Sequence, residues 1–232
     1  MPPLQRHQLV HLGAEGWQQV SAQACDDVAR ACIDHWAAAR LPLVVTRQYP
    51  HNPAALALGL PAPLCWERRR LALQIDWRYV DCFDEFPSVQ DVGALLPRHG
   101  RAAWSRLGAA LSALDAGGRV YGSHGWQHLS GLPYLRADSD IDLRLAVDDA
   151  HHADAVAAVL ERHGTQLPRR LDGELQFADG RAFAWREWQA WRAGRSRAIL
   201  CKTLNAVSLE WRDRVGSAAT QQGFPMAVAA HP

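Results

Sequence analysis

One stretch of the chain, residues 120–147, restricts the fold and the chemistry more than any other part of the sequence. A short apolar strand ends at Gly122 and Ser123, where a helix begins, and a second strand starts at Asp140 and Asp142. Because side chains alternate along a strand, the two aspartates share one face, and the residue between them points to the other. Two carboxylates on one face repel each other unless a cation neutralises them. The stretch therefore predicts a divalent cation held through oxygen ligands.

The helix start beside these aspartates is suited to binding an anion. Gly122 and Ser123 place backbone N–H groups and a hydroxyl at the positive end of the helix dipole. His124 follows directly and is a candidate contact to a substrate phosphate or ribose. An anion site next to a cation site indicates an enzyme that binds a metal-bound polyphosphate. The alternative is that Gly122 and Ser123 form an ordinary turn and that the aspartates are solvated.

Lys202 is the only lysine in the chain, since all the other basic residues except the histidines are arginines. It lies within an apolar strand, residues 198–204, where an ammonium group is costly unless it reaches water or an anion. Lysine is a common point-charge ligand for phosphate. Two roles stay open for Lys202: a contact to substrate phosphate, or an ion pair that supports the fold.

The hydrophobic periodicity predicts an α+β fold in two parts. Residues 1–88 are expected to form a small N-terminal α/β domain, and residues 89–215 a catalytic domain in which helices flank a mixed sheet. Residues 216–232 are rich in Gly, Ala and Pro and are expected to be a C-terminal tail. Two local predictions are a helix over residues 22–39 and, because of four prolines and a glycine, a loop over residues 49–63 with one helical turn at 54–57.

Composition excludes several classes of protein. The net charge of +1 and the lack of a basic stripe argue against nucleic acid as a partner. No apolar run approaches the ~20 residues that a membrane span needs, so no membrane is expected either. The five cysteines are odd in number and lack C-x-x-C spacing, which favours reduced thiols in the cytoplasm. One basic cluster, Trp66 to Arg70, is either a solvated face or a contact to phosphate or to an acidic carrier protein.

Longer motifs carry a resemblance to a known family. The Gly-Ser and Asp-x-Asp pair resembles the nucleotidyltransferase superfamily, and its surroundings resemble the malonate decarboxylase holo-acyl-carrier-protein synthases, which are phosphoribosyl-dephospho-CoA transferases. The segments that carry the second resemblance are Gly122-Ser123-x-x-Trp126-Gln127-x-Leu129-Ser130-Gly131-Leu132-Pro133-Tyr134-Leu135 and Ser139-Asp140-Ile141-Asp142-Leu143. Softer similarities occur in residues 41–47, 59–63 and 69–74, and again in residues 171–175, 179–181, 185–187 and 200–203.

The resemblance implies a reaction and a set of site residues. The donor would be 2′-(5″-triphosphoribosyl)-3′-dephospho-CoA, the acceptor a serine of the acyl-carrier protein of malonate decarboxylase, and the leaving group pyrophosphate. Asp140 and Asp142 would bind two Mg²⁺ ions. A third carboxylate is expected on the strand over residues 169–177; Glu174 is preferred, also as a metal ligand, because it lies further inside the strand, and Asp172 is the alternative.

Two other functions stay open. The first is a nucleotidyltransferase that uses ATP or a similar triphosphate on another small-molecule or protein acceptor. The second is a carrier-binding protein without catalytic activity, which the intact Gly-Ser and the acidic residues disfavour. The product formed on the acceptor would distinguish the enzymes, and absence of pyrophosphate release would indicate the binding protein.

Overall fold

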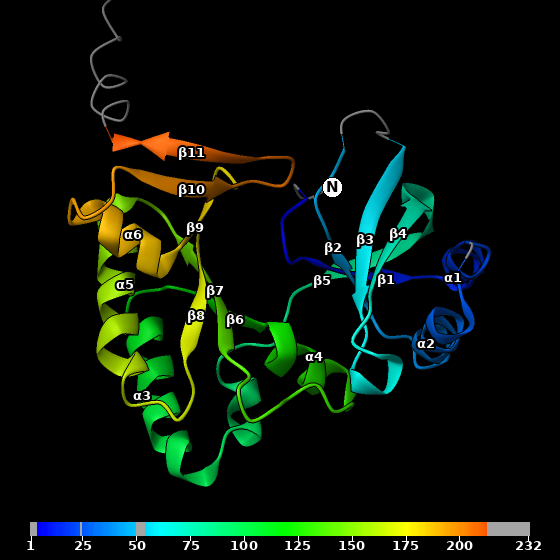
Figure 1. Ribbon diagram of the computed structural model, residues 1–232, viewed down its shortest axis with the longest axis horizontal. Helices are drawn as coiled ribbons and strands as arrows, with labels where there is room; N and C mark the ends of the chain where they lie inside the picture. Colours follow the sequence, from blue (N-terminus) through cyan, green and yellow to red (C-terminus); the bar gives the residue numbers. More distant parts are fainter. Residues whose placement is uncertain (1–3, 24, 50–53, 213–232) are drawn as a thin grey trace, which may run out of the picture.

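The computed structural model describes residues 4–23, 25–49 and 54–212, which form two β-sheets with helices packed against each (Figure 1). The predicted α+β class is confirmed. The predicted tail, residues 216–232, lies outside the described residues. Two hydrophobic clusters, one for each sheet, fill the interior.

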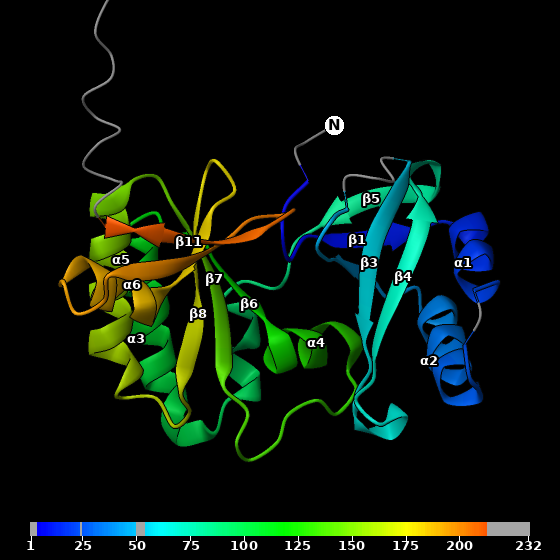
Figure 2. The same cartoon turned by 45° about the horizontal axis from the view of Figure 1, so that its top comes forward.

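The N-terminal sheet has five strands in the order β4-β3-β2-β1-β5, and all its neighbouring strands are antiparallel. Two helices lie at the outer end of this sheet, away from the second sheet (Figures 1 and 2). The strands are β1 (Leu9–Leu12), β2 (Leu43–Val45), β3 (Ala55–Pro61), β4 (Arg70–Asp76) and β5 (Val80–Asp84), and the helices are α1 (Ala14–Ser21) and α2 (Asp27–Ala38).

Two local predictions in this part of the chain were wrong. Residues 54–57 do not form a helical turn, because β3 begins at Ala55 and pairs with β4 along its whole length. The leucines of β3 alternate into the core, and Pro61 is tolerated because it ends the strand. The helix predicted over residues 22–39 is shorter, since the carboxylate of Asp26 accepts the Ala29 N–H and starts α2 at Asp27. The preceding helix α1 was not predicted.

The second sheet has six strands in the order β11-β10-β9-β8-β7-β6. Only β7 and β8 are parallel among the described pairs, and α5 is the crossover between them. α3, α5 and α6 cover one face of this sheet (Figure 1). The strands are β6 (Gly118–Tyr121), β7 (Ile141–Val147), β8 (Leu171–Phe177), β9 (Ala182–Ala184), β10 (Ala198–Lys202) and β11 (Val207–Trp211), and the helices are α3 (Arg101–Ser112), α5 (Ala150–Gly164) and α6 (Trp185–Arg192).

A short helix, α4 (Gly122–Ser130), connects the two parts of the molecule. Its N-terminus follows β6 directly, so it belongs to the six-stranded sheet by sequence. Its Trp126, however, is buried in the hydrophobic cluster of the N-terminal sheet, with ring centroids 5.3 Å from Phe86 and 6.4 Å from Trp36. The helix start at Gly122 is therefore fixed by both sheets.

Two properties expected from composition can be compared with the structure. All five cysteines are free thiols. Within the described ranges, no helix is both long enough and apolar enough to cross a membrane.

Candidate active site

The predicted aspartates meet where β7 and β8 begin. The parallel register pairs Asp142 with Asp172, and Asp140 directly precedes β7. The guanidinium of Arg170 lies 3.9 Å from an oxygen of Asp140 and 3.6 Å from an oxygen of Asp172. Carboxylates from the starts of β7 and β8 thus approach one positive charge, and Asp142 lies two residues after Asp140 and opposite Asp172.

The ionisation of Asp142 reflects its surroundings. Burial of the carboxylate, together with the nearby charges of Asp172, Asp140 and Glu174, raises the pKa of Asp142 to about 6. A carboxylate that is disfavoured as an anion by burial and by other anions gains free energy when a cation binds beside it. Asp142 is consequently the residue of this group whose charge most needs a positive partner.

Gly122 lies directly against Asp142. The β6–β7 register pairs Tyr121 with Asp142, which brings the aspartate beside the start of α4. Gly122 has φ of +61°, and a Cβ atom at this position would overlap the Oδ2 atom of Asp142 and lie 3.0 Å from its Cγ. Glycine is required here both for the backbone conformation and for the space. The anion-binding end of the helix and the buried carboxylate are therefore adjacent.

Ser123 and His124 have different positions, although they are neighbours in sequence. Ser123 lines a cavity, and its hydroxyl bonds to no other described residue. His124 is 1% exposed and does not line that cavity. Its Nδ1 donates to the carbonyl oxygen of Asp140 over 3.1 Å, and burial and the charge of Arg169 lower its pKa to about 4. His124 is thus a neutral residue that positions Asp140, and its buried ring lies outside the cavity in which the predicted contact to substrate would be made.

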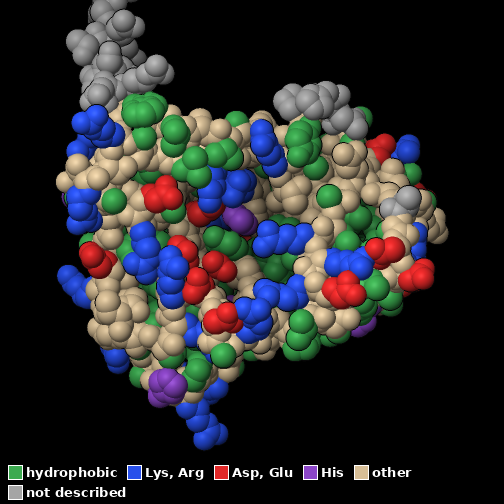
Figure 3. All heavy atoms as spheres, in the orientation of Figure 1, with side chains coloured by type: hydrophobic (Ala, Val, Ile, Leu, Met, Phe, Trp, Pro, Cys, Tyr) green, Lys and Arg blue, Asp and Glu red, His purple; other side chains and the backbone are tan. Residues whose placement is uncertain are grey.

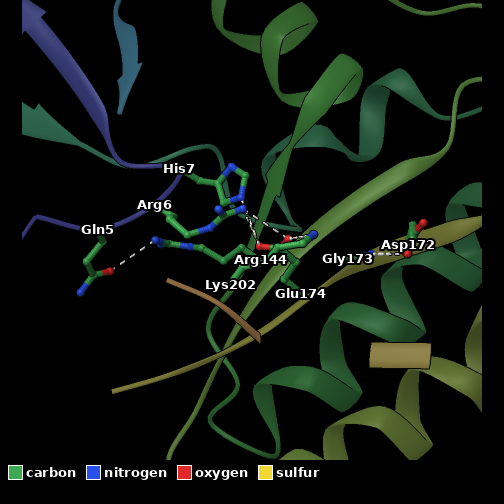
Figure 4. Close-up of polar contacts among 8 residues, drawn as sticks. All are labelled: Gln5, Arg6, His7, Arg144, Asp172, Gly173, Glu174 and Lys202. Carbon is green, nitrogen blue, oxygen red and sulfur yellow. Dashed lines mark hydrogen bonds and ion pairs between the residues drawn. The ribbon is translucent and has the colours of Figure 1, made fainter. Parts of the chain in front are cut away.

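Glu174 is buried on β8, two residues beyond Asp172 and opposite Arg144. Basic side chains surround its carboxylate (Figure 4). Its Oε1 accepts from Lys202 Nζ over 2.7 Å, and its Oε2 lies 3.3 Å from His7 Nε2 and 3.4 Å from Arg6. Burial acts to raise the pKa of Glu174, but His7, Arg6 and Lys202 together hold it well below its usual range. Of the two roles left open for Lys202, the structure contains the ion pair.

The two candidates for the third carboxylate, Glu174 and Asp172, have different surroundings. Figure 4 shows Asp172 beside Gly173, away from the group of cations around Glu174. The N–H of Gly173 donates to Asp172 Oδ1 over 2.9 Å and orients that carboxylate. Asp172 pairs with Asp142 in the register of β7 and β8. Glu174 instead forms an ion pair with Arg6 and so links the six-stranded sheet to the N-terminal segment. The geometry thus favours Asp172 as the third carboxylate, although Glu174 was preferred from the sequence.

A cavity of about 460 Å³ lies between the two parts of the molecule, next to the start of α4. Figure 3 shows this hollow with basic side chains along its edges and acidic side chains on the side of the six-stranded sheet. Its volume falls within the range typical of small-molecule sites. The lining consists of Arg6, His7, residues 44–47 and 61–64, Arg68, Arg70, Gly122, Ser123, Trp126 and residues 133–136.

Three residues near the site were missed by sequence reasoning. Arg170 directly precedes β8, the strand that carries Asp172, and the pair of arginines before that strand was the only available signal in the sequence. Arg6 and His7 come from the other end of the chain, and no local pattern marks them. His7 stacks on Tyr121 with ring centroids 4.2 Å apart, which places it beside the start of α4.

The carboxylates do not form a preassembled metal cage. In the described part of the chain, no three His, Cys, Asp or Glu side chains are grouped closely enough to hold a metal ion by themselves. The donor set nevertheless fits Mg²⁺, which is commonly bound by one or two carboxylates together with substrate phosphates. The guanidinium of Arg170 already places one positive charge between the carboxylates of Asp140 and Asp172.

Comparison with known proteins assigns the chain to a family. Residues 5–83 match the family described as phosphoribosyl-dephospho-CoA transferase MdcG N-terminal domain, and residues 88–213 match the corresponding C-terminal domain. A phosphoribosyl-dephospho-CoA transferase of Bradyrhizobium diazoefficiens is 34% identical over 218 residues, which cover 94% of this chain and 95% of the relative.

Further relatives of the same description support this assignment. The Xanthomonas campestris pv. campestris protein is 33% identical over 85% of this chain and 89% of its own length. The Pseudomonas aeruginosa protein is 31% identical over 67% of this chain and 72% of its own length. No solved structure matches. The chain, over both of its sheets, belongs to the phosphoribosyl-dephospho-CoA transferase family.

Proposed function

We propose that this enzyme transfers phosphoribosyl-dephospho-CoA from 2′-(5″-triphosphoribosyl)-3′-dephospho-CoA to a serine of the acyl-carrier protein of malonate decarboxylase, releasing pyrophosphate. The observation that carries the proposal is the contact between Gly122 and Asp142 at one end of the cavity. It places an anion-binding helix start against a carboxylate that needs a cation. Membership of the transferase family agrees with this chemistry.

The substrate triphosphate is assigned to the start of α4. The hydroxyl of Ser123 and the N–H groups of the first helical turn have no intrahelical partners, so they can donate to the β- and γ-phosphates that leave as pyrophosphate. Gly122 allows the chain to approach the phosphates closely. These donors act by stabilising charge that grows on the leaving group.

Asp140, Asp142 and Asp172 are assigned as the residues that would hold Mg²⁺, with two ions expected. Bound Mg²⁺ would neutralise the phosphate oxygens and align the attacking and leaving oxygens. Asp172 replaces Glu174 in this assignment because it is level with Asp142 and is not enclosed by Arg6, His7 and Lys202. His124 keeps the backbone of Asp140 in place.

The transfer itself makes one bond and breaks one bond. The serine oxygen of the carrier protein attacks the α-phosphorus, and the bond from that phosphorus to the oxygen bridging the β-phosphate breaks. We assign Asp172 as the acceptor of the serine proton, through Oδ2, which lies 3.6 Å from the exposed Arg170 while Oδ1 accepts the Gly173 N–H. The product is a phosphodiester on the carrier serine. The five free thiols fit the cytoplasm, which is the compartment we propose.

The test is a mass measurement on the acceptor. Apo carrier protein is incubated with the enzyme, triphosphoribosyl-dephospho-CoA and Mg²⁺, and the carrier is weighed by intact-protein mass spectrometry. We expect a mass gain equal to phosphoribosyl-dephospho-CoA and an equimolar release of pyrophosphate. ATP in place of the donor tests the alternative nucleotidyltransferase. An unmodified carrier, or a carrier that gains AMP from ATP and nothing from the CoA donor, would contradict the proposal.

A further inference from the structure

The basic cluster at residues 66–70 is divided by the fold into two sides. Arg68 and Arg70 line the cavity, whereas Arg69 between them does not. Arg69 instead forms ion pairs with Asp26 and Glu67 on the outside of the N-terminal domain. Three consecutive arginines therefore have different surroundings, and only two of them can meet a ligand in the cavity.

Three of the arginines that line the cavity lack an ion pair, whereas Arg6 and Arg136, which also line it, are paired with carboxylates. Arg68 and Arg70, together with Arg47 after β2, form no ion pair with any carboxylate in the described ranges. Arg47 donates through Nε to the carbonyl oxygen of Asn205, which leaves its terminal nitrogens available. Among the described residues that line this cavity, none is an aspartate or a glutamate. An array of cations that no carboxylate pairs with at close range is suited to an anionic ligand.

The cavity has two ends of different origin. Gly122 and Ser123 belong to the catalytic domain, whereas Arg47, Arg68 and Arg70 belong to the N-terminal domain. Between these ends the wall is largely apolar, with Val44, Pro61 and other residues of the N-terminal domain. A ligand that fits this arrangement has two separate anionic groups and an apolar or planar part.

We propose that Arg47, Arg68 and Arg70 bind the diphosphate bridge of the dephospho-CoA portion of the donor. This inference rests on the proposed function, which places the reacting triphosphate at Gly122 and Ser123. The donor carries a second diphosphate, between adenosine and the pantetheine arm, so the N-terminal domain acts as the site for a nucleoside diphosphate. The apolar wall is placed to accept the adenine ring. Arginine is well suited to this task because its planar fork binds two phosphate oxygens at once.

The experiment measures binding of dephospho-CoA alone to the full chain by isothermal titration calorimetry. Dephospho-CoA contains the diphosphate bridge and lacks the triphosphate. The double variant Arg68→Gln/Arg70→Gln should weaken binding of dephospho-CoA and of ADP at least tenfold. The control is Arg69→Gln, which makes the same change at the residue between them and should stay within twofold of wild type. Both arginines in the double variant are exposed and form no ion pair with a described residue, so the variant should fold, and a thermal melt checks this.

Inorganic tripolyphosphate with Mg²⁺ is the second probe. Its affinity should be unchanged in the Arg68→Gln/Arg70→Gln variant, because it occupies the other end of the cavity. The inference is overturned if the variant loses tripolyphosphate binding and retains dephospho-CoA binding. It is equally overturned if steady-state assays show a higher KM for the carrier protein with an unchanged KM for the donor, since the arginines would then dock an acidic carrier.

Failure of this inference and failure of the proposed function give different results. If wild-type enzyme modifies the carrier and the double variant binds dephospho-CoA normally, only the assignment of the arginines is wrong. If wild-type enzyme neither binds dephospho-CoA nor modifies the carrier, the proposed function is wrong and the inference with it.

Discussion

Gly122 and Asp142 are in contact across the β6–β7 pair, and the contact leaves no room for a Cβ atom on the glycine. The relationship joins two motifs that are separated in sequence by a loop. It means that the helix start and the carboxylate to which we assign Mg²⁺ cannot be moved independently. Any side chain at position 122 must displace the carboxylate of Asp142 or the start of α4.

The first prediction uses this contact. Gly122→Ala should lower kcat/KM for transfer at least 100-fold, about 2.7 kcal/mol of transition-state free energy, because it moves the Asp142 carboxylate. Gly131→Ala is the matched control, since Gly131 ends the same helix with φ of +70° and has open space around it. The control should lose about 1 kcal/mol of stability through backbone strain and retain activity. Equal activity in the two variants would show that the contact is unimportant.

The second prediction concerns the pH dependence of stability. The pKa of Asp142 is raised to about 6 in the folded protein, so this group binds more protons when folded than when unfolded. Its contribution is fully present below pH 4 and is lost as the pH rises through 6. Asp142→Asn should therefore be more stable than wild type at pH 8 without metal, by about 1–3 kcal/mol, and nearly equal to it at pH 4. Urea unfolding at the two pH values measures the difference, and a variant less stable at pH 8 would contradict it.

The third prediction separates the two candidate carboxylates on β8. Asp172→Asn should abolish most Mg²⁺-dependent transfer and leave the melting temperature near that of wild type, because Asp172 is paired only with the exposed Arg170 at 3.6 Å. Glu174→Gln should have the opposite profile, with a lower melting temperature because Arg6, Lys202 and the His7 ring lose their common carboxylate. Titration of activity against Mg²⁺ concentration provides the readout. Loss of Mg²⁺ dependence in the Glu174 variant alone would restore the assignment made from sequence.

The fourth prediction concerns Lys202. Lys202→Ala should reduce the free energy of unfolding by about 1–3 kcal/mol, because a buried carboxylate loses its shortest ion pair while Arg6 and His7 remain. The KM for the donor should be unchanged in the folded variant, since Lys202 does not line the cavity. Denaturant melts and donor saturation curves on the same preparation test both parts. A raised donor KM at normal stability would instead indicate a phosphate ligand.

The sequence was sufficient for features that depend on local pattern. The strand, helix and strand around Gly122 and Asp142 follow from alternation and from the glycine. Local pattern could not decide between Asp172 and Glu174 as the third carboxylate, because both lie on the same face of β8. Only the register between β7 and β8 shows which of them is opposite Asp142. Register between parallel strands is a tertiary property.

Other features were missed because long-range pairing outweighs local preference. The prolines near β3 indicated a loop, yet the alternating leucines of residues 55–61 form a complete set of pairs with β4. Arg6 and His7 reach the site from the opposite end of the chain, through a contact with Glu174 that spans 168 positions. Nothing near residue 6 in the sequence could indicate such a partner.

The cations around Glu174 also impose an order on synthesis. Arg6 and His7 are made before β1, and all five strands of the N-terminal sheet have been made by residue 84. Their carboxylate partner is made 168 positions after Arg6, and Lys202 follows another 28 positions later. An unfinished chain can therefore complete its first sheet. The contact of Arg6 with Glu174 has to wait for β8, and that of Lys202 with Glu174 has to wait for β10, so the buried carboxylate is neutralised in two separate steps.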